Sequence, residues 1–315
     1  MGREQASPSS WEALWREVPE FPGTQALGFE HKPLLTHLFR TYPPLISEFT
    51  FTNLFIWRQA YRIQLSRYRG FLCLLAEKGG SSFFFPPIGE GDLVDCCRML
   101  LRTMAGQGRV AQIARVPEKT LSLFDWEAEG FALEYDRDNS DYVYSVEDLV
   151  YLRGRKYHRK RNHIKRFKEQ YPHQYVPLTP DLISQCLDLQ ASWCDLKHCE
   201  ADPGLSQEFL AIKEALAHFE ALEIQGGAIL IDGKVEAFTL GEPLNPDTVV
   251  IHIEKANPAF DGLYPALNQA FLEHQWTSFT YVNREQDLGE EGLRRAKESY
   301  FPHHMVHKYS LSLKG

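Results

Sequence analysis

The spacing of apolar residues alternates along the chain between the two-residue period of β-strands and the wider spacing of amphipathic helices. In the first half, two apolar runs joined through Gly79-Gly80 predict a β-hairpin, which a helix and another strand follow. These elements are expected at 71–78, 81–87, 91–108 and 110–116. An acidic, turn-rich segment at 136–149 predicts the connection to the second half.

The second half repeats this plan, with Asp232-Gly233 between two alternating runs as its strongest hairpin signal. Strands are expected within 227–242 and at 248–256, 278–283 and 305–313, and helices at 154–170, 180–197, 264–275 and 290–299. Hairpins combined with helices predict an α/β (α+β) fold with mixed, largely antiparallel sheets. A length of 315 residues suits two domains, which we expect at 1–140 and 141–315.

Charge is distributed unevenly along the chain. The net charge is −8, yet the segment RGRKYHRKRNHIKRFK at 153–168 holds nine Lys and Arg residues and no acid. The remainder of the chain therefore carries −17. A helix with this composition can bind the phosphates of RNA or of an anionic lipid headgroup, or it can be a solvated face that pairs with acidic residues of its own protein.

Other features bear on location and metal binding. No apolar run approaches the ~18 residues of a membrane span, and the N-terminus lacks the apolar core of a signal peptide, so we expect a cytoplasmic protein with no transmembrane segment. The cluster Cys194-Asp-Leu-Lys-His-Cys199 has no second pair of ligands. We therefore expect free thiols and no metal site.

The stretch YVNREQDLGEEGLRRAKESYFP, at 281–302, places charged residues directly after a predicted strand. Asp287 and Glu290 have the spacing of a capping box, which makes Asp287 the expected N-cap of the next helix. That role leaves Arg284 and Glu285 unexplained, and they are either site residues or an internal ion pair. Lys297, on the same helix, has the same two alternatives: it is a site residue or part of an internal ion pair.

The order of elements resembles the GNAT (acyl-CoA N-acyltransferase) fold, present twice. Three segments, LRGRKYHRKRNHIKRF, IHIEKANPAFDGLYPALNQAF and YVNREQDLGEEGLRRAKESYFPHHMVHKYSL, resemble the C-terminal domain of phosphatidylglycerol lysyltransferases and its free-standing bacterial relatives. The resemblance implies a tandem GNAT-like fold, as in the Fem-type aminoacyltransferases, which take an amino acid from aminoacyl-tRNA. Membrane-bound relatives transfer the amino acid to phosphatidylglycerol.

The resemblance implies an acyl- or aminoacyltransferase that moves an aminoacyl group from aminoacyl-tRNA to an amine or hydroxyl acceptor, which includes a lipid such as phosphatidylglycerol. The expected partners are aminoacyl-tRNA and an anionic lipid headgroup, and no cofactor is expected beyond an aminoacyl-tRNA or acyl-CoA donor. The alternative is a non-catalytic GNAT-fold module that binds an anionic partner through its basic helix.

Several residues are candidates for the site in the second domain. Glu285 or Glu254 would accept the proton of the nucleophile, and Lys297 falls where the helix lysine of the lysyltransferases lies. Those relatives carry an Asp and an Arg where this chain has Glu254-Lys255. The expected substrate-binding residues are Asn283, Arg284, Gly262, Tyr264, Arg159, Lys160 and Arg161. Gly262 is the only glycine left of a CoA-binding turn, and Asp261 beside it would repel phosphate.

Overall fold

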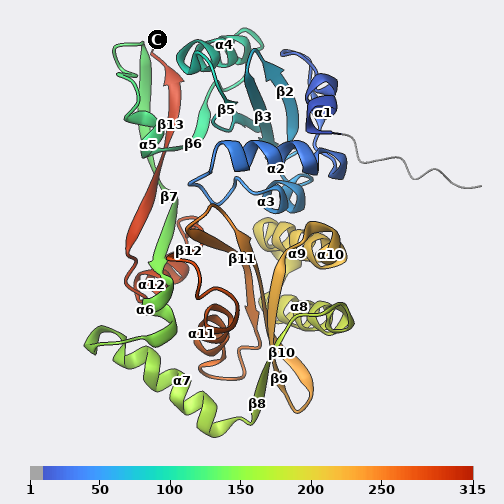
Figure 1. The fold of residues 1–315 in the computed structure, drawn as a ribbon, viewed down its shortest axis with the longest axis vertical. Coiled ribbons are helices and arrows are strands. Elements are labelled where there is room, and N and C mark those ends of the chain that lie inside the picture. Colours follow the sequence, from blue (N-terminus) through green and yellow to red (C-terminus); the bar gives the residue numbers. More distant parts are fainter. Residues whose placement is uncertain (1–9, 315) are drawn as a thin grey trace, which may run out of the picture. The chain divides into compact units, whose positions relative to one another are not determined.

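The computed structural model describes residues 10–314, which form two compact units (Figure 1). Unit 1 comprises the chain up to Pro44, Phe49–Asp136 and the residues from Lys308 onward, and unit 2 comprises Leu45–Glu48 and Arg137–His307. Two long strands, β7 (Phe131–Ser145) and β13 (His304–Leu313), supply residues to both units.

Unit 1 is built around a sheet whose strands follow the order β1-β2-β3-β4-β6-β13, with β5 paired to β3. Its strands are β1 (Gln25–Ala26), β2 (Gln64–Tyr68), β3 (Phe71–Lys78), β4 (Ser81–Phe84), β5 (Ile88–Gly89) and β6 (Ile113–Pro117). Its helices are α1 (Trp11–Glu17), α2 (Lys32–Thr41), α3 (Phe51–Trp57), α4 (Leu93–Gly106) and α5 (Glu118–Leu121), with a 3-10 turn at Phe29–His31. The apolar face of α4 packs on β3, β4 and β6 and forms the core of this unit.

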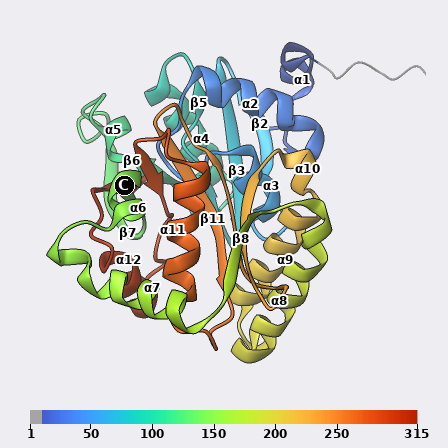
Figure 2. The same ribbon diagram turned by 60° about the horizontal axis from the view of Figure 1, so that its bottom comes forward.

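Unit 2 has the strand order β7-β12-β11-β10-β9-β8. Its remaining strands are β8 (His173–Pro177), β9 (Gln225–Ile231), β10 (Lys234–Pro243), β11 (Thr248–Ala256) and β12 (Tyr281–Asn283). Its helices are α6 (Val146–Tyr151), α7 (His158–Gln170), α8 (Ile183–Lys197), α9 (Pro203–Ala217), α10 (Phe219–Leu222), α11 (Leu263–Gln275) and α12 (Glu291–Glu298), and 3-10 turns lie at Arg155–Tyr157, Pro180–Leu182 and Cys199–Ala201. Helix α11 covers one face of the sheet, and α8 and α9 cover the other (Figures 1 and 2).

The two units share one topological plan. In unit 1, the antiparallel strands β2, β3 and β4 are followed by α4 and then by β6, which pairs parallel with β4. In unit 2, the antiparallel strands β8 to β11 are followed by α11 and then by β12, which pairs parallel with β11. An antiparallel strand then closes the sheet, β13 in unit 1 and β7 in unit 2. The predicted mixed, largely antiparallel fold with two similar halves is therefore confirmed.

Some local predictions were wrong. The segment 136–149 is not a connection, because it forms the second half of β7 and the start of α6. Its acidic residues are accommodated by tertiary partners: the buried carboxylate of Asp141 accepts hydrogen bonds from Ser47 and from Asn283. Composition alone had suggested a solvated turn.

The expectation of free thiols fails for one pair of cysteines. Cys194 and Cys199 form a disulfide where α8 gives way to the turn before α9, and this removes both sulfurs as thiolate ligands. Among residues 10–314, no group of three or more His, Cys, Asp and Glu side chains is placed to hold a metal ion. None of the helices in that range combines the length and the apolar character that a membrane span requires.

Candidate active site

The sheet of unit 2 opens where β11 and β12 diverge. The two strands pair in parallel over only three residues, from Thr248 to Val250 on β11, and β12 ends at Asn283. Strand β11 continues to Ala256 with β10 as its neighbour on one side. The gap in the sheet thus lies beside residues 251–256, and the chain that leaves β12 passes next to it.

A β-bulge in β11 lies in this gap. Leu240 of β10 pairs with Ile253. Its neighbour Gly241 pairs with Ile251, so His252 is an extra residue with no counterpart on β10. A bulge of this kind reverses the alternation of side chains beyond it and commonly re-aims a side chain beside a functional site.

The bulge turns Glu254 toward the face that α11 covers. Ile251 packs against α11 before the bulge. After it, Asn268 of α11 donates a hydrogen bond to Glu254 at 3.5 Å. Lys255 points to the opposite face, where its ammonium lies 2.8 Å from a carboxylate oxygen of Glu208. If β11 paired regularly with β10 beyond Ile251, Ile253 would lie opposite Thr239, where Glu254 now lies.

Arg284 and Glu254 form a largely buried ion pair in the gap, with side chains 15% and 13% exposed. Nε and Nη2 of Arg284 donate to Oε2 of Glu254 at 3.2 and 2.7 Å. Although burial alone would lower it, the Glu254 carboxylate raises the pKa of Arg284 above its ordinary value. Nη1 of Arg284 and Oε1 of Glu254 are buried as well, and neither has a hydrogen-bond partner among residues 10–314. A buried polar group without a partner is costly, so a ligand that pairs with these two atoms would gain free energy.

A tyrosine and a lysine border this ion pair. The ring centroid of Tyr300 lies 4.8 Å from Cζ of Arg284. Nζ of Lys160, on α7, lies 3.8 Å from the same ring centroid. Burial raises the pKa of Tyr300 to about 12, and burial together with the charge of Arg284 lowers the pKa of Lys160 to about 8. The basic helix therefore contributes one side chain to the site.

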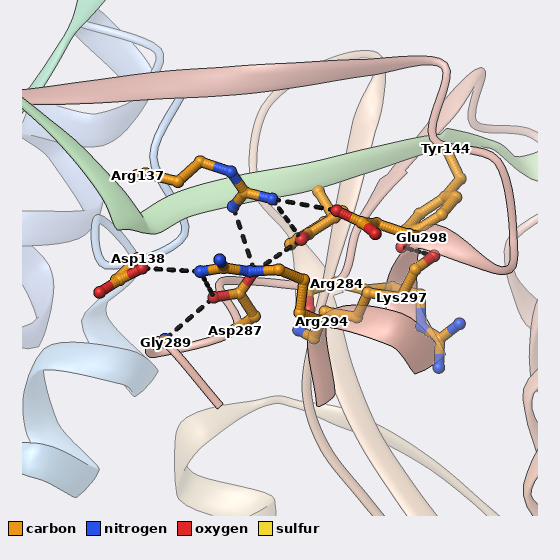
Figure 3. Close-up of polar contacts among 10 residues, drawn as sticks. Arg137, Asp138, Tyr144, Arg284, Asp287, Gly289, Arg294, Lys297 and Glu298 are labelled. Atoms are coloured by element: carbon orange, nitrogen blue, oxygen red, sulfur yellow. Dashed lines mark hydrogen bonds and ion pairs between the residues drawn. The ribbon is translucent and has the colours of Figure 1, made fainter. Parts of the chain in front are cut away.

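Lys297 approaches the site from α12. Its ammonium donates to the backbone carbonyl of Arg284, and the hydroxyl of Tyr144 donates to the carbonyl of Lys297 at 2.9 Å (Figure 3). Burial, helped by the charge of Arg284, lowers the pKa of Lys297 to about 8. Its amine is therefore partly unprotonated near neutral pH, as a general base requires. We call Arg284, Glu254, Lys160, Lys297 and Tyr300 the candidate active site.

Glu285 does not point freely into the gap, because its carboxylate is held by His252. Nδ1 of His252 lies 2.8 Å from Glu285 Oε1, and Nε2 lies 3.0 Å from Glu242 Oε1. The His252 side chain is 2% exposed. Burial alone would lower its pKa, but hydrogen bonds to the two carboxylates raise it to about 9. Of the two roles left open for Glu285, the internal ion pair is the one that the contacts support.

This triad predicts a pH dependence of folding. A pKa that rises from 6.5 to about 9 on folding corresponds to about 3 kcal/mol, present in full below about pH 6.5 and lost as the pH passes about 9. The free energy of unfolding of the parent should thus exceed that of His252→Gln by a margin that shrinks by about 3 kcal/mol between about pH 6 and pH 10. Urea unfolding at both pH values measures this margin. A margin that does not change with pH would show that folding leaves the pKa of His252 unshifted.

Asp287 is not the N-cap of α12, contrary to the prediction from spacing. That helix begins at Glu291 with Glu290 as its N-cap. Asp287 is instead buried at the centre of a network in which five donors surround its carboxylate (Figure 3). These are Nε and Nη2 of Arg294, both at 2.9 Å, Tyr142 Oη at 2.6 Å, Arg137 Nη1 at 3.1 Å and the backbone N–H of Gly289 at 2.9 Å. The network ties α12 to the loop that carries Arg284.

The start of α11 is sealed by α7 and is not open to a phosphate. Gly262, its N-cap, has φ of 86°, and a Cβ there would lie 2.5 Å from the carbonyl oxygen of His163. Asp261 lies 3.5 Å from a ring nitrogen of His163. Tyr264 is partly exposed nearby, and burial raises its pKa, with a further contribution from Glu254. The helix N-terminus that holds the CoA pyrophosphate in GNAT enzymes is therefore covered here.

The three remaining substrate-binding candidates, Arg159, Arg161 and Asn283, lie outside the candidate active site. Arg159 is exposed on α7, with no ion pair among the described residues. Arg161 uses its guanidinium to cap α6 through the carbonyls of Leu152 and Gly154. Asn283 is fully buried, and its side chain donates to Asp141 and accepts from the N–H of Glu285. Asn283 thus shapes the loop after β12 instead of facing the gap.

Sequence reasoning missed His252, Glu242 and Tyr300 as parts of this region. No spacing in the sequence links His252 to Glu242 or Glu285. Tyr300 follows the last helix, α12, and nothing in its spacing marks it as a neighbour of Arg284. Only the folded sheet brings these residues together.

The comparisons with known proteins agree with this geometry. Residues 39–312 match the family model described as "Phosphatidylglycerol lysyltransferase, C-terminal". The chain belongs to this family. A conserved protein of unknown function from Bacteroides thetaiotaomicron has a crystal structure that is similar with a TM-score of 0.85 and 36% identity, over 92% of this chain and 99% of that chain. The family and the fold together support an aminoacyl- or acyltransferase of the lysyl-phosphatidylglycerol synthase type.

Two other proteins show weaker similarity, one in structure and one in sequence. The C-terminal domain of a putative lysylphosphatidylglycerol synthetase from Agrobacterium fabrum is similar with a TM-score of 0.64 and 14% identity, over 89% of this chain and 90% of that chain. An uncharacterized protein of Mycoplasmoides gallisepticum is 22% identical over 71% of this chain and 73% of its own length.

Proposed function

We propose that unit 2 transfers an aminoacyl group from aminoacyl-tRNA to a hydroxyl or amine acceptor. The observation that carries this proposal is the buried pair of Arg284 and Glu254, which keeps one donor and one acceptor atom unpartnered where β11 and β12 diverge. An aminoacyl ester offers the complementary groups, namely a carbonyl oxygen and an α-ammonium.

The chemistry follows from these groups. The acceptor oxygen or nitrogen forms a bond to the carbonyl carbon of the ester, and the bond between that carbon and the ribose oxygen then breaks. Lys297 takes the proton of the acceptor and returns it to the departing ribose oxygen. The N–H on Nη1 of Arg284 stabilises the negative charge that develops on the carbonyl oxygen. Oε1 of Glu254 accepts a hydrogen bond from the α-ammonium and so orients the aminoacyl group.

Two features favour tRNA over CoA as the donor. The N-terminus of α11 is packed against α7 at Gly262, so it offers no room for a pyrophosphate. Helix α7 also concentrates positive charge, with Arg159 exposed and Lys160 directed to the site. Contacts to RNA phosphates need such a surface, whereas CoA binding in GNAT folds uses the helix N-terminus that is covered here. The family name favours a lipid hydroxyl such as that of phosphatidylglycerol as the acceptor.

The donor assignment predicts which activated compound reacts. Incubated with tRNA charged with radiolabelled lysine and with phosphatidylglycerol vesicles, the protein should move label into the lipid fraction. Acetyl-CoA at about 1 mM should neither react nor raise the melting temperature, because a ligand that binds only the folded state stabilises it. Arg284→Met serves as the control and should lower kcat about 10²–10³-fold. Acyl transfer from CoA, or saturable CoA binding, would contradict the assignment.

One observation favours a second candidate, a non-catalytic module that binds an anionic partner. Glu285 is bonded to His252, and Arg284 to Glu254, so these charges stabilise one another inside the fold. Such a module would bind tRNA with the same affinity in the parent and in Arg284→Met, and label would not move to any acceptor. The transfer assay therefore separates the two candidates directly.

A further inference from the structure

A cavity of about 330 Å³ lies beside α7 in unit 2 and shares no lining residue with the candidate active site. Its uncharged walls are Tyr151 at the end of α6, Ile164 on α7 and Gln269 on α11. This volume is at the lower end of the range of small-ligand pockets, so it suits one compact group and not a helix or a strand. We call it the α7 pocket.

The charged walls of the α7 pocket are strongly positive. Arg161, Lys165 and Lys168 recur at helical spacing along one stripe of α7, and Glu169 is the single acid in the lining. Lys165 lies 3.6 Å from Glu169 in an exposed pair, which is weak in water. Lys168 has no ion pair within residues 10–314. The pocket therefore carries an excess of two positive charges and favours an anion.

The uncharged walls suit a planar ring beside that anion. Tyr151 is 54% exposed, and the guanidinium of Arg153 lies over one face of its ring with Cζ 4.4 Å from the ring centroid, which leaves the opposite face for a second planar group. Gln269 donates through Nε2 to the carbonyl of Val150 at 2.7 Å, which leaves its Oε1 as an acceptor. Ile164, 5% exposed, is an apolar wall. A ring that stacks on Tyr151 would place its amino or hydroxyl group near the Gln269 oxygen.

We infer that the α7 pocket binds one nucleotide of an RNA strand, its base against Tyr151 and its phosphates at Lys165 and Lys168. The inference rests on the proposed function and adds a subsite to it. A concave pocket fits a single splayed nucleotide better than a flat bilayer surface. Aromatic stacking with lysine contacts is a usual mode of single-strand recognition.

The charge half of this inference is tested by fluorescence anisotropy with the full chain and a labelled 12-nucleotide single-stranded RNA ending in CCA. Lys165→Ala with Lys168→Ala should flatten the slope of log K against log salt by about 1.4, since each contact to a single strand contributes about 0.7. Lys119→Ala with Lys213→Ala removes the same charge from α5 and α9, which do not line the pocket. An equal loss in both double variants would overturn the subsite, because only net charge would then matter.

Stacking of a base on the Tyr151 ring is tested by comparing the RNA affinities of Tyr151→Ala and Tyr151→Phe. Loss of one stacked base weakens binding about 5- to 150-fold, and the salt slope should stay unchanged because no phosphate contact is lost. Tyr151→Phe keeps the ring and should bind like the parent. Both variants change an exposed side chain, so their melting curves should match the parent. Equal affinity of Tyr151→Ala and Tyr151→Phe would show that no base stacks in the pocket.

Two further arms separate the alternatives. Vesicles of phosphatidylglycerol and phosphatidylcholine should bind the parent and the lysine double variant equally. If the double variant loses vesicle binding and keeps RNA binding, the pocket belongs to a lipid headgroup. If the parent binds no RNA at all, the proposed donor fails together with the subsite. If the parent binds RNA and the pocket variants match it, only the subsite fails.

Discussion

Replacing Asp287 with alanine is expected to lower the free energy of unfolding by about 3 kcal/mol, because Tyr142 and two arginines, each 31% exposed, lose the buried acceptor that they share. The carboxylate is fully buried and accepts from Arg294, Tyr142 and Arg137 at 2.6–3.1 Å. Loss of an ordinary N-cap would cost only about 0.5–2 kcal/mol. Urea unfolding near neutral pH measures the difference.

Asp138→Ala is the matched control for Asp287. Asp138 accepts from the same arginine, Arg294, at 2.7 Å, but its side chain is 58% exposed. An exposed pair contributes about 0–1 kcal/mol, so this variant should unfold nearly as the parent does. Equal and small losses in both variants would show that the network around Asp287 does not hold the fold.

Acid adds a second readout for Asp287. Burial would raise its pKa, but hydrogen bonds from Arg294 and Tyr142 hold the pKa far below the ordinary value. A depressed pKa stabilises the fold above about pH 4, and the contribution is lost only as the pH falls through the folded value. The difference in unfolding free energy between the parent and Asp287→Asn should therefore persist at about pH 4 and decline in stronger acid.

Lys297→Met is expected to lower kcat of aminoacyl transfer by about 10²–10⁴-fold, the usual contribution of a general base. With a pKa lowered to about 8, Lys297 gains its unprotonated form as the pH rises, so kcat of the parent should rise through about pH 8. The rise should be absent in the variant. Steady-state rates from about pH 6 to 9.5, with labelled aminoacyl-tRNA, test both statements.

Lys160→Met is the control, because burial and Arg284 lower its pKa to about 8 as well. Lys160 lies over Tyr300, whereas Lys297 donates to the carbonyl of Arg284. If Lys160→Met abolishes the pH-dependent rise and Lys297→Met does not, the base is Lys160. If Lys297→Met loses stability but keeps both rate and pH profile, Lys297 only braces the loop that carries Arg284.

Regular elements with a clear period could be predicted from the sequence alone. β3 and β11 lie within the bounds that alternation gave, and α4, α11 and α12 lie within one or two residues of theirs. These elements are set by local spacing, because a strand or helix must bury one regular face. The basic segment also needed no tertiary knowledge, since α7 carries its charge in consecutive turns.

The tertiary structure decided which charges meet. The bulge at His252 turns Glu254 toward Arg284. No local pattern in the sequence of β11 predicts this bulge. Spacing predicted that Asp287 is a helix cap, whereas Arg137 and Tyr142 from distant β7, together with Arg294 of α12, make it the centre of a network. An ion pair depends on positions in three dimensions, so residues 30 or more apart in sequence leave no periodic trace.

The same reason explains the covered start of α11 and the strand formed by the segment 136–149. From the sequence, Gly262 indicates a turn that could bind a phosphate, but the backbone of His163 in α7 packs against it. The segment 136–149 reads as a solvated connection, but its backbone pairs with β12 and closes the sheet of unit 2. The sequence by itself determined the fold class, most of the elements and the basic helix, because these depend on local spacing and composition. The site's ion pairs, its closed CoA position and its bulge were decided only by long-range packing.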